Sequence, residues 1–284
     1  MKKSHALEKT MSAVFTVCGL AALAFAAAIT LFLCFSGIPA IREIGFFKFI
    51  LGKVWNPTGA EPAYGILPFI LSSVYGTLGA VVLGVPMGIL CAAYMAKAAP
   101  RPIAAALSEA VNLLSGIPSV VYGLVGMIVL VPAVRNVFGL PDGASLFAAI
   151  LVLAIMILPS VISVSETAIK AVPREYEEGS LALGATRNET IFRVILPAAK
   201  SGIFASAVLG TGRAIGEAMA VMMVSGNVSN MPKLFKSVRF LTTAVASEMS
   251  YSSGLQRQAL FSVALVLFVF ILIINIILNA LKKR

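Results

Sequence analysis

The feature that most constrains the fold of this chain is the recurrence of long stretches without a charged residue. Lipid satisfies no backbone hydrogen bonds, so a chain crosses a bilayer as helices or as a closed barrel. The bilayer core is about 30 Å thick, which takes roughly 20 apolar helical residues at about 1.5 Å each. None of the stretches alternates like a barrel strand, so each predicts a membrane-spanning helix. Five are uncharged, at 11–37, 62–96, 110–134, 143–165 and 258–280, and a sixth at about 202–227 contains only Arg213 and Glu217.

The composition agrees with a membrane protein and excludes an ordinary soluble domain. Charged residues make up 12% of the chain, whereas a soluble domain carries about 25%. We therefore predict an all-α membrane protein that forms one domain over residues 1–284. The first uncharged run has 27 residues, too many for the roughly 7–15-residue core of a signal peptide, so we expect it to be retained. The six transmembrane helices are expected at about 11–36, 65–97, 104–134, 143–168, 202–227 and 258–281.

The distribution of basic residues sets the expected orientation. The formal net charge is +10, which on a soluble protein would suggest a nucleic-acid partner. Here the basic residues lie in short connections and at both chain ends, so the expected surroundings are membrane lipid and not nucleic acid. With the N-terminus inside, thirteen Lys and Arg residues face the cytoplasm and eight face outward. The positive-inside rule therefore predicts cytoplasmic N- and C-termini in a bacterial plasma (inner) membrane.

Residue types that commonly carry catalysis or bind metals are scarce. Cys18, Cys34 and Cys91 lie in apolar stretches at unrelated spacings, which suggests neither disulfides nor a metal site. The only histidine, His5, lies in the N-terminal tail. The sequence also lacks the G-x-x-x-x-G-K-[ST] loop with which many proteins bind ATP. We therefore expect no enzymatic activity, no metal and no cofactor in this chain.

The most polar stretch, about 170–201, is predicted to be a cytoplasmic loop with its own internal structure. Pro173 suits the start of a helix, and the three acidic residues that follow it closely are favoured there by the helix dipole. Gly184 stands where a left-handed residue ends a helix. A second helix is predicted at once, because Thr186 and Glu189 have the spacing of a capping box.

The second helix of this loop begins at about Arg187 and presents an apolar face that ends at Leu196 and Pro197. Two interpretations are open. The loop either packs against its own bundle, or it forms a protein-binding surface in the cytoplasm. Acids, arginines and an apolar face occur together outside the membrane, and this composition favours the protein-binding surface.

The spacing within the loop resembles the signature E-A-A-x3-G-x9-I-x-L-P of ABC importer permeases. Glu178-Gly179-Ser180 is followed after three residues by Gly184, and after nine more by Val194-Ile195-Leu196-Pro197. Small residues replace both alanines, and a β-branched valine replaces the isoleucine. The resemblance implies a MetI-like ABC importer permease fold, in which this loop inserts into a groove of the ATP-hydrolysing subunit. The residues that it implies for this coupling are Glu178, Gly184, Thr186, Arg187, Glu189, Leu196 and Pro197.

Two further stretches, Ser115–Leu124 and Gly212–Asn227, resemble the phosphate permeases of the Pst system, and the second is closer to their C-type subunit. This resemblance implies that the chain forms half of the pathway of an ATP-driven inorganic phosphate importer. The implied partners are two copies of an ATPase that holds ATP and Mg, a second related permease of the A type, and an extracytoplasmic phosphate-binding protein. The alternatives are a permease for another oxyanion, such as molybdate or tungstate, and an ion-gradient-driven secondary transporter.

Arg213 and Glu217 lie near the middle of the fifth predicted helix. A charge at the bilayer centre costs at least about 2.5–3.5 kcal/mol on insertion scales, so both side chains are expected to face the bundle or a water-filled path. Four residues apart, they share one helix face and can pair. They either form a structural ion pair, or Arg213 attracts the oxyanion while Glu217 holds it until phosphate competes for the guanidinium. Gly210, Gly212 and Gly216 leave room for close helix approach, and the last two form a small-xxx-small step.

Prolines mark places where the membrane helices are expected to be interrupted, and such breaks often line a substrate path. Ser115 and Ser119 flank Pro118 and are further candidates for the pathway, together with Tyr122. Their hydroxyl groups either bind a passing anion or bind a backbone carbonyl that the proline frees, and the backbone role is favoured. The prolines in the second, third and fourth predicted helices are Pro68, Pro86, Pro118, Pro132 and Pro159.

Overall fold

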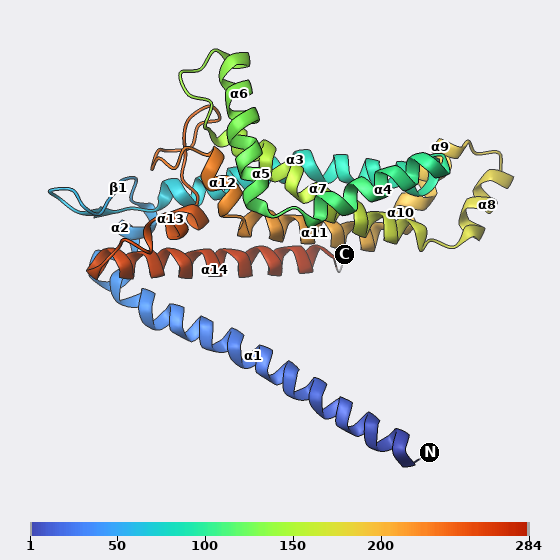
Figure 1. Ribbon diagram of the computed structural model, residues 1–284, viewed down its shortest axis with the longest axis horizontal. Helices are drawn as coiled ribbons and strands as arrows, with labels where there is room; N and C mark the ends of the chain where they lie inside the picture. Colours follow the sequence, from blue (N-terminus) through green and yellow to red (C-terminus); the bar gives the residue numbers. More distant parts are fainter. Residues whose placement is uncertain (1, 283–284) are drawn as a thin grey trace.

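The computed structural model describes residues 2–282, apart from the side chains of residues 2–7, 279, 281 and 282. Four long helices, α3, α7, α11 and α14, run alongside one another (Figure 1). Within the described residues, five helices are long and apolar enough to cross a membrane, and a sixth candidate is a bent helix pair. The prediction of an all-α membrane protein with about six spans is confirmed. The bounds are Leu67–Ala93 for α3, Leu146–Lys170 for α7, Lys200–Gly216 for α11 and Gly254–Lys282 for α14.

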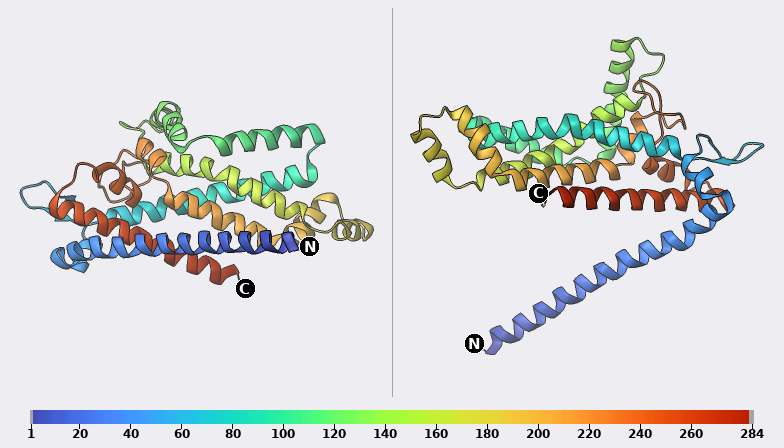
Figure 2. Two further views of the ribbon diagram at one scale, coloured as in Figure 1. Left: turned by 60° about the horizontal axis from the view of Figure 1, so that its bottom comes forward. Right: turned by 180° about the vertical axis from the view of Figure 1, so that it is seen from behind.

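Helix α1, Lys2–Ile44, is longer than the predicted 11–36 and leaves the bundle at an angle (Figure 2). The C-terminal part of α1 contacts the N-terminal part of α14, where Ser262 Oγ donates a 2.6 Å hydrogen bond to the Gly37 carbonyl oxygen. Beside this bond the rings of Phe32 and Phe261 pack edge to face. From residue 8 to residue 29 every side chain is exposed. Helix α1 is therefore attached to the bundle at one end.

The interruption predicted at Pro118 is confirmed, but residues 104–134 do not form one span, because the chain turns sharply at this proline (Figure 1). Helix α4 ends before Ile117, whose ψ of 127° is extended. A proline disfavours helical backbone in the residue before it, which explains the break. After Pro118 the chain runs at a steep angle to the bundle (Figure 1). The elements are α4 Arg101–Gly116, α5 Ser119–Val125, the π-helical turn η2 Gly126–Leu130 and α6 Val131–Phe138.

The other prolines do not separate helices. Pro86 and Pro159 lie inside α3 and α7, so the interruptions predicted there do not occur. Pro68 and Pro132 lie in the first turns of α3 and α6. A first turn tolerates proline, because the missing N–H has no helical partner in any case.

Helices α3 and α7 approach each other closely because α3 carries glycines on the contact face. An added Cβ atom at Gly79, Gly84 or Gly88 would lie 2.6–2.8 Å from an isoleucine or valine side chain of α7. Helices in a bilayer associate through such close packing, since lipid tails are as apolar as the side chains. The three glycines thus fix how α3 lies along α7. Helix α3 continues for one π-helical turn, η1, at Tyr94–Ala98.

Replacing Gly84 with alanine is expected to loosen this contact. The new methyl group would lie 2.8 Å from Ile157 Cδ1 and 2.9 Å from the Ala154 carbonyl oxygen. Overpacking of this kind costs about 1–3 kcal/mol, so the thermal unfolding midpoint of the purified protein should fall by about 2 °C or more. Gly19→Ala is the matched control, because nothing lies within 4 Å of an added Cβ there. Equal midpoints for the two variants would contradict the packing argument.

Helix α11 also packs on α7 through small and hydroxyl-bearing residues. The fully buried Ser165 and Ser206 share a hydrogen bond of 2.7 Å between their Oγ atoms. At Gly210 an added Cβ would lie 2.8 Å from Val161 Cγ2. The expected step at Gly212 and Gly216 makes no such approach, since within the described residues no heavy atom lies within 4 Å of a Cβ at either position. The close approach therefore falls on Gly210, as expected, and not on the step at Gly212 and Gly216.

Short elements close one end of the bundle and are tied together by Glu248. The Glu248 carboxylate accepts hydrogen bonds from Trp55 Nε1 at 3.1 Å and from Gln256 Nε2 at 3.2 Å, and it pairs with Arg239. Arg239 Nε in turn donates a 2.9 Å bond to the Asn227 carbonyl oxygen. The elements are α2 Phe46–Leu51, the antiparallel pair β1 Trp55–Asn56 and β2 Ala63–Tyr64, α12 Met219–Val224 and α13 Leu241–Glu248.

Candidate docking hairpin and substrate pathway

A helical hairpin, residues 173–198, projects from the end of the bundle opposite β1 and β2 (Figure 1). Pro173 is the residue before its first helix, as expected. Its two limbs are joined to each other by a 2.9 Å hydrogen bond between Ser180 Oγ and Thr190 Oγ1. The elements of the helical hairpin are α8 Arg174–Ala182, α9 Arg187–Thr190, the π-helical turn η3 Ile191–Ile195 and α10 Leu196–Ala198.

The corner of the helical hairpin has the predicted local structure. Gly184 has a φ of 86°, the left-handed conformation that glycine adopts without strain. The capping box is present, since the Thr186 amide donates to Glu189 Oε2 at 2.9 Å and the Glu189 amide donates to Thr186 Oγ1 at 3.3 Å. The hydrogen bonds from the Thr186 amide and hydroxyl hold the pKa of the Glu189 carboxyl below its usual value. The corner is therefore defined by residues within six positions of one another.

The second limb ends at Ala198, one residue beyond the predicted stop at Pro197. Ala199 follows, and the chain bends there by 73° into α11. The limb is anchored on its inner side, where Ile191 and Ile195 are buried. Leu196 is half-buried, whereas Pro197 is exposed.

The outer face of the helical hairpin is open to a partner. Glu178 and Gly184, both predicted to take part in coupling, are exposed, and Arg187 is exposed as well although its guanidinium reaches back to the Lys97 carbonyl oxygen. Leu183 directly precedes Gly184 in the sequence, and its side chain is 91% exposed. Sequence reasoning missed this residue, although an apolar side chain immediately before a glycine corner in a polar loop could have indicated it. Tyr176, Leu181 and Phe192 of the helical hairpin are exposed as well, and several exposed apolar side chains on one segment mark a candidate surface for a protein partner.

Arg213 lies on α11 and is half-buried in the membrane-spanning part of the bundle. One guanidinium nitrogen, Nη1, donates a 3.1 Å hydrogen bond to Ser160 Oγ of α7. Within the described residues no carboxylate lies at ion-pair distance from it. The arginine is thus held by a neutral group and keeps its charge uncompensated by a nearby anion.

The expected pairing of Arg213 with Glu217 on one helix face is wrong, because α11 ends at Gly216. Glu217 is extended, with a ψ of 124°. Its Oε1 atom accepts a 2.9 Å hydrogen bond from the Ala220 amide at the start of α12, and its carbonyl oxygen accepts one from Thr242 Oγ1 at 2.9 Å. Glu217 therefore stabilises the break between α11 and α12.

The serines predicted for the pathway lie on either side of the break at Pro118. Ser115 is exposed near the end of α4, and Ser119 is half-buried at the start of α5. Tyr122 donates a 2.7 Å hydrogen bond from its hydroxyl to the Leu114 carbonyl oxygen. Pro118 has no N–H for that carbonyl, so the predicted role of binding a freed backbone group is confirmed for Tyr122.

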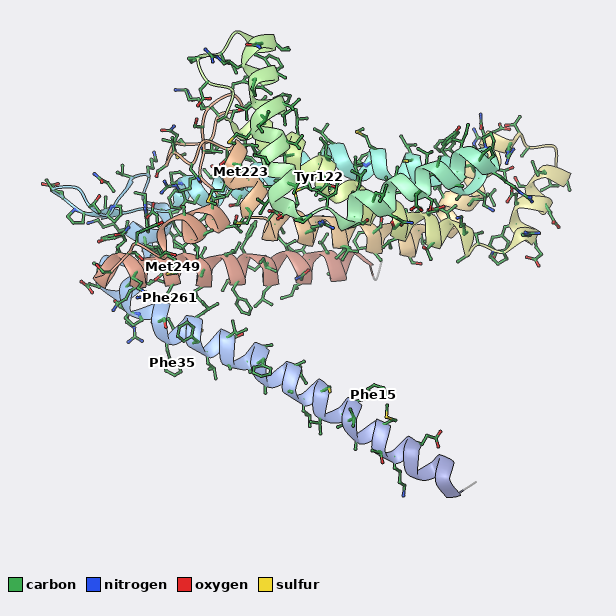
Figure 3. The ribbon with its side chains drawn as sticks, viewed as in Figure 1. Phe15, Phe35, Tyr122, Met223, Met249 and Phe261 are labelled. Carbon is green, nitrogen blue, oxygen red and sulfur yellow. The ribbon has the colours of Figure 1, made fainter. Side chains whose placement is uncertain are left out.

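Helix α5 brings this break close to the end of α11. An added Cβ at Gly123 of α5 would lie 2.8 Å from Ala220 Cα of α12, which follows the end of α11. Figure 3 labels Tyr122 on α5 and Met223 on α12, and an added Cβ at Gly123 would lie 2.8 Å from Met223 Sδ. The two interrupted helices and the one intramembrane arginine on α11 thus meet in one region. Within the described residues no group of His, Cys, Asp and Glu could hold a metal ion.

Comparison with known protein families decides the class of this chain. The family described as binding-protein-dependent transport system inner membrane component matches residues 84–284. This chain belongs to that family. The matched region contains the helical hairpin, Arg213 and five of the candidate spans or parts of them. With five or six candidate spans among the described residues, this permease is a multi-pass membrane protein, and its family works with ATPase and substrate-binding partners.

Named relatives extend the similarity over most of the permease. The probable ABC transporter permease protein YqgH of Bacillus subtilis is 38% identical over 276 residues, which cover 95% of this chain and 89% of that protein. The phosphate transport system permease protein PstC of Haemophilus influenzae is 34% identical and covers 86% of this chain, with 82% of its own length matched. PstC of Pasteurella multocida is 33% identical, with 85% of this chain and 81% of that protein covered.

Solved structures share the fold of the permease. A chain of the inward-facing MetNI methionine ABC transporter superposes with a TM-score of 0.57 at 20% identity, covering 77% of this chain and 93% of that one. A chain of an amino acid ABC transporter gives a TM-score of 0.55 at 21% identity, with 77% and 92% covered. At such identities the likeness concerns the fold alone. The predicted MetI-like fold is confirmed.

Proposed function

We propose that this permease is a membrane subunit of an ATP-driven importer of inorganic phosphate and forms half of its translocation pathway. The observation that carries the proposal is the setting of Arg213, a half-buried guanidinium in the membrane whose bonded partner is the neutral Ser160 hydroxyl. An arginine fork matches the spacing of phosphate oxygens and stays charged at any physiological pH. Relatives named as phosphate permeases, at 33–34% identity, support the same substrate.

The pathway residues receive separate roles in this proposal. Arg213 attracts the anion, and Ser160 holds the guanidinium in place. Glu217 is the hinge between α11 and α12, so a movement there changes the direction in which α11 presents Arg213. Ser115 and Ser119 offer hydroxyl groups to a hydrated anion beside the break at Pro118.

The helical hairpin is proposed to dock on an ATP-binding subunit, two copies of which serve the complete transporter. ATP and Mg are held by those subunits, so this chain is a transport subunit without enzymatic activity and without a cofactor of its own. The exposed outer face of the hairpin supports this role. The coupling residues are Glu178, Gly184, Thr186, Arg187, Glu189, Leu196 and Pro197, to which we add Leu183.

The remaining partners follow from the half-pathway that one such chain provides. A second related permease of the PstA type completes the pathway, and an extracytoplasmic phosphate-binding protein delivers the anion at the end that carries β1 and β2. Helices α1 and α14 both run between that end and the side of the helical hairpin (Figure 2), which supports cytoplasmic N- and C-termini. The permease thus lies in a bacterial plasma membrane with the hairpin inside.

A permease for molybdate or tungstate is the second candidate, because those tetrahedral oxyanions also suit a guanidinium. The test uses the complete transporter in proteoliposomes with its binding protein, and it measures ATP hydrolysis as each anion is added. We expect phosphate to stimulate hydrolysis severalfold, with little effect of molybdate or tungstate. Stimulation by those anions and not by phosphate would overturn the substrate assignment. Uptake that continues without ATP would instead indicate an ion-gradient-driven transporter.

A further inference from the structure

We propose that Lys97 is the point at which the helical hairpin grips α3, so that a movement of the hairpin moves α3 as well. The grip consists of three residues, Lys97, Glu177 and Arg187, which we call the clamp. This inference rests on the proposed docking of the hairpin on an ATPase. It adds the route by which a movement of the helical hairpin reaches the membrane helices.

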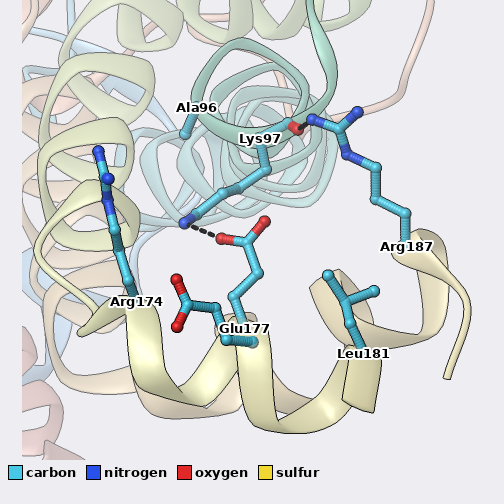
Figure 4. Close-up of a pocket in the computed structure, with 7 residues that line it drawn as sticks. Ala96, Lys97, Arg174, Glu177, Leu181 and Arg187 are labelled. Carbon is cyan, nitrogen blue, oxygen red and sulfur yellow. Dashed lines mark hydrogen bonds and ion pairs between the residues drawn. The ribbon is translucent and has the colours of Figure 1, made fainter. Parts of the chain in front are cut away.

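The first half of the clamp is an ion pair between two elements far apart in the sequence. Lys97 lies in η1 at the end of α3, and Glu177 lies in the first turn of α8 (Figure 4). Their Nζ and Oε2 atoms are 2.6 Å apart, and the side chains are only 13% and 27% exposed. An exposed ion pair contributes little, whereas a shielded and hydrogen-bonded pair is stronger and fixes geometry. The pair therefore sets where α8 lies relative to α3.

The second half of the clamp uses the backbone of the same residue. A guanidinium nitrogen of Arg187, in the first turn of α9, donates a hydrogen bond to the Lys97 carbonyl oxygen. The last carbonyl groups of a helix have no partner within the helix, and Pro100 just beyond it has no N–H to offer. Arg187 fills this vacancy with a positive charge at the negative end of the helix dipole. Both limbs of the helical hairpin thus bind the same residue, Lys97, in the turn that continues α3.

Without the clamp, the hairpin would be linked to the bundle mainly by turns and apolar contacts. The chain connects it to α7 through the residues before Pro173 and to α11 through the 73° bend at Ala199. An apolar cluster that includes Met95 of η1 and Ile195 of η3 packs beneath it. Apolar packing is not directional, so it resists separation better than sliding. The clamp supplies directional contacts, through which a sideways movement of the helical hairpin is transmitted to α3.

Helix α3 is suited to transmit such a movement through the membrane. Its glycines at positions 79, 84 and 88 hold it closely against α7. At its other end Ser73 Oγ accepts a 3.0 Å hydrogen bond from the Leu241 amide at the start of α13. A displacement at Lys97 therefore reaches the elements that close the opposite end of the bundle. The π-helical turn that carries Lys97 is itself a form that occurs frequently at functional sites.

The test is made on the complete transporter in proteoliposomes, with phosphate uptake and ATP hydrolysis measured in the same vesicles. Lys97→Met keeps the length of the side chain without its charge, and Glu177→Gln keeps its shape. We expect both variants to assemble and to hydrolyse ATP at close to the basal rate, while phosphate carried per ATP falls about tenfold, within the usual range of coupling between sites. The exchange variant Lys97→Glu/Glu177→Lys should restore most of the coupling.

Two controls separate the clamp from simpler explanations. Lys170→Met removes a 2.6 Å ion pair with Glu166 that lies within α7 and links no two elements, so coupling should be unchanged. Lys97→Arg keeps the charge and should couple well even if Lys97→Met assembles poorly. Normal coupling in Lys97→Met, or a loss that the exchange variant does not restore, would overturn the proposal. Failure of the proposed function differs visibly, because the unmodified transporter would then show no phosphate-dependent hydrolysis.

Discussion

Replacement of Arg213 with glutamine is expected to abolish phosphate uptake while the transporter still assembles. Glutamine is two atoms shorter than arginine and gives up the bond to Ser160, but it is polar, uncharged and no larger, so the helix packing around α11 should persist. What disappears is the positive charge. In the proposed function the guanidinium and phosphate form a charge pair. Removing one partner of a buried, hydrogen-bonded charge pair costs about 2–5 kcal/mol, and every 1.4 kcal/mol is about tenfold in affinity. Uptake of radiolabelled phosphate by proteoliposomes should therefore fall about a hundredfold or more.

The matched control for this prediction is Ser160→Ala. It removes the hydroxyl group that holds Arg213 at 3.1 Å but leaves the guanidinium. A single hydrogen bond contributes about 0.5–1.5 kcal/mol net, so uptake should fall less than about tenfold. Size-exclusion chromatography establishes that both variants assemble. Normal uptake by Arg213→Gln would show that the arginine serves packing alone.

Replacement of Leu183 with glutamate is expected to prevent the ATP-binding subunit from docking. The side chain is 91% exposed in the isolated chain, and burial of a leucine against a partner contributes about 1.5–3 kcal/mol. A carboxylate in its place adds the cost of removing a charge from water. The combined loss is typical of an interface hot spot, where truncation costs at least about 2 kcal/mol. Co-purification of the ATP-binding subunit should fall about thirtyfold or more.

Tyr251→Glu provides the control for the docking prediction. Tyr251 is 92% exposed, so the two positions match in exposure. It follows α13, at the end of the bundle that carries β1 and β2. The same change of charge at this position should leave the ATP-binding subunit in place. If Leu183→Glu co-purifies with that subunit as the unmodified chain does, Leu183 is not an anchor.

Features set by neighbouring residues were predictable from the sequence. The capping box and the left-handed Gly184 involve residues at most six positions apart, so their spacing carries all the information. The approximate number of spans, though not every break within them, was predictable because the length of an apolar run reports directly on the thickness of the bilayer. Tyr122 likewise reaches a carbonyl group only eight residues away.

Features set by distant contacts were not predictable in this way. The break after Gly216 depends on the Thr242 hydroxyl, 25 residues from the Glu217 carbonyl group that it binds. The ion pair between Lys97 and Glu177 joins residues 80 positions apart. Neither contact leaves a periodic pattern in the sequence. Proline was an equally incomplete guide, since Pro118 ends a helix while Pro159 lies inside one without ending it.

The single attachment of α1 has a consequence for how the protein accommodates membranes of different thickness. The uncharged part of α1 has 27 residues, about 40 Å of helix at about 1.5 Å per residue, against a hydrocarbon core of about 30 Å. The surplus is accommodated by tilt, and transmembrane helices tilt by up to about 40°. Because α1 is fastened at Gly37 and exposed from residue 8 to residue 29, a thicker or thinner bilayer changes its slant. We therefore expect α1 to accommodate hydrophobic mismatch by tilting, apart from the packed helices and the arginine among them.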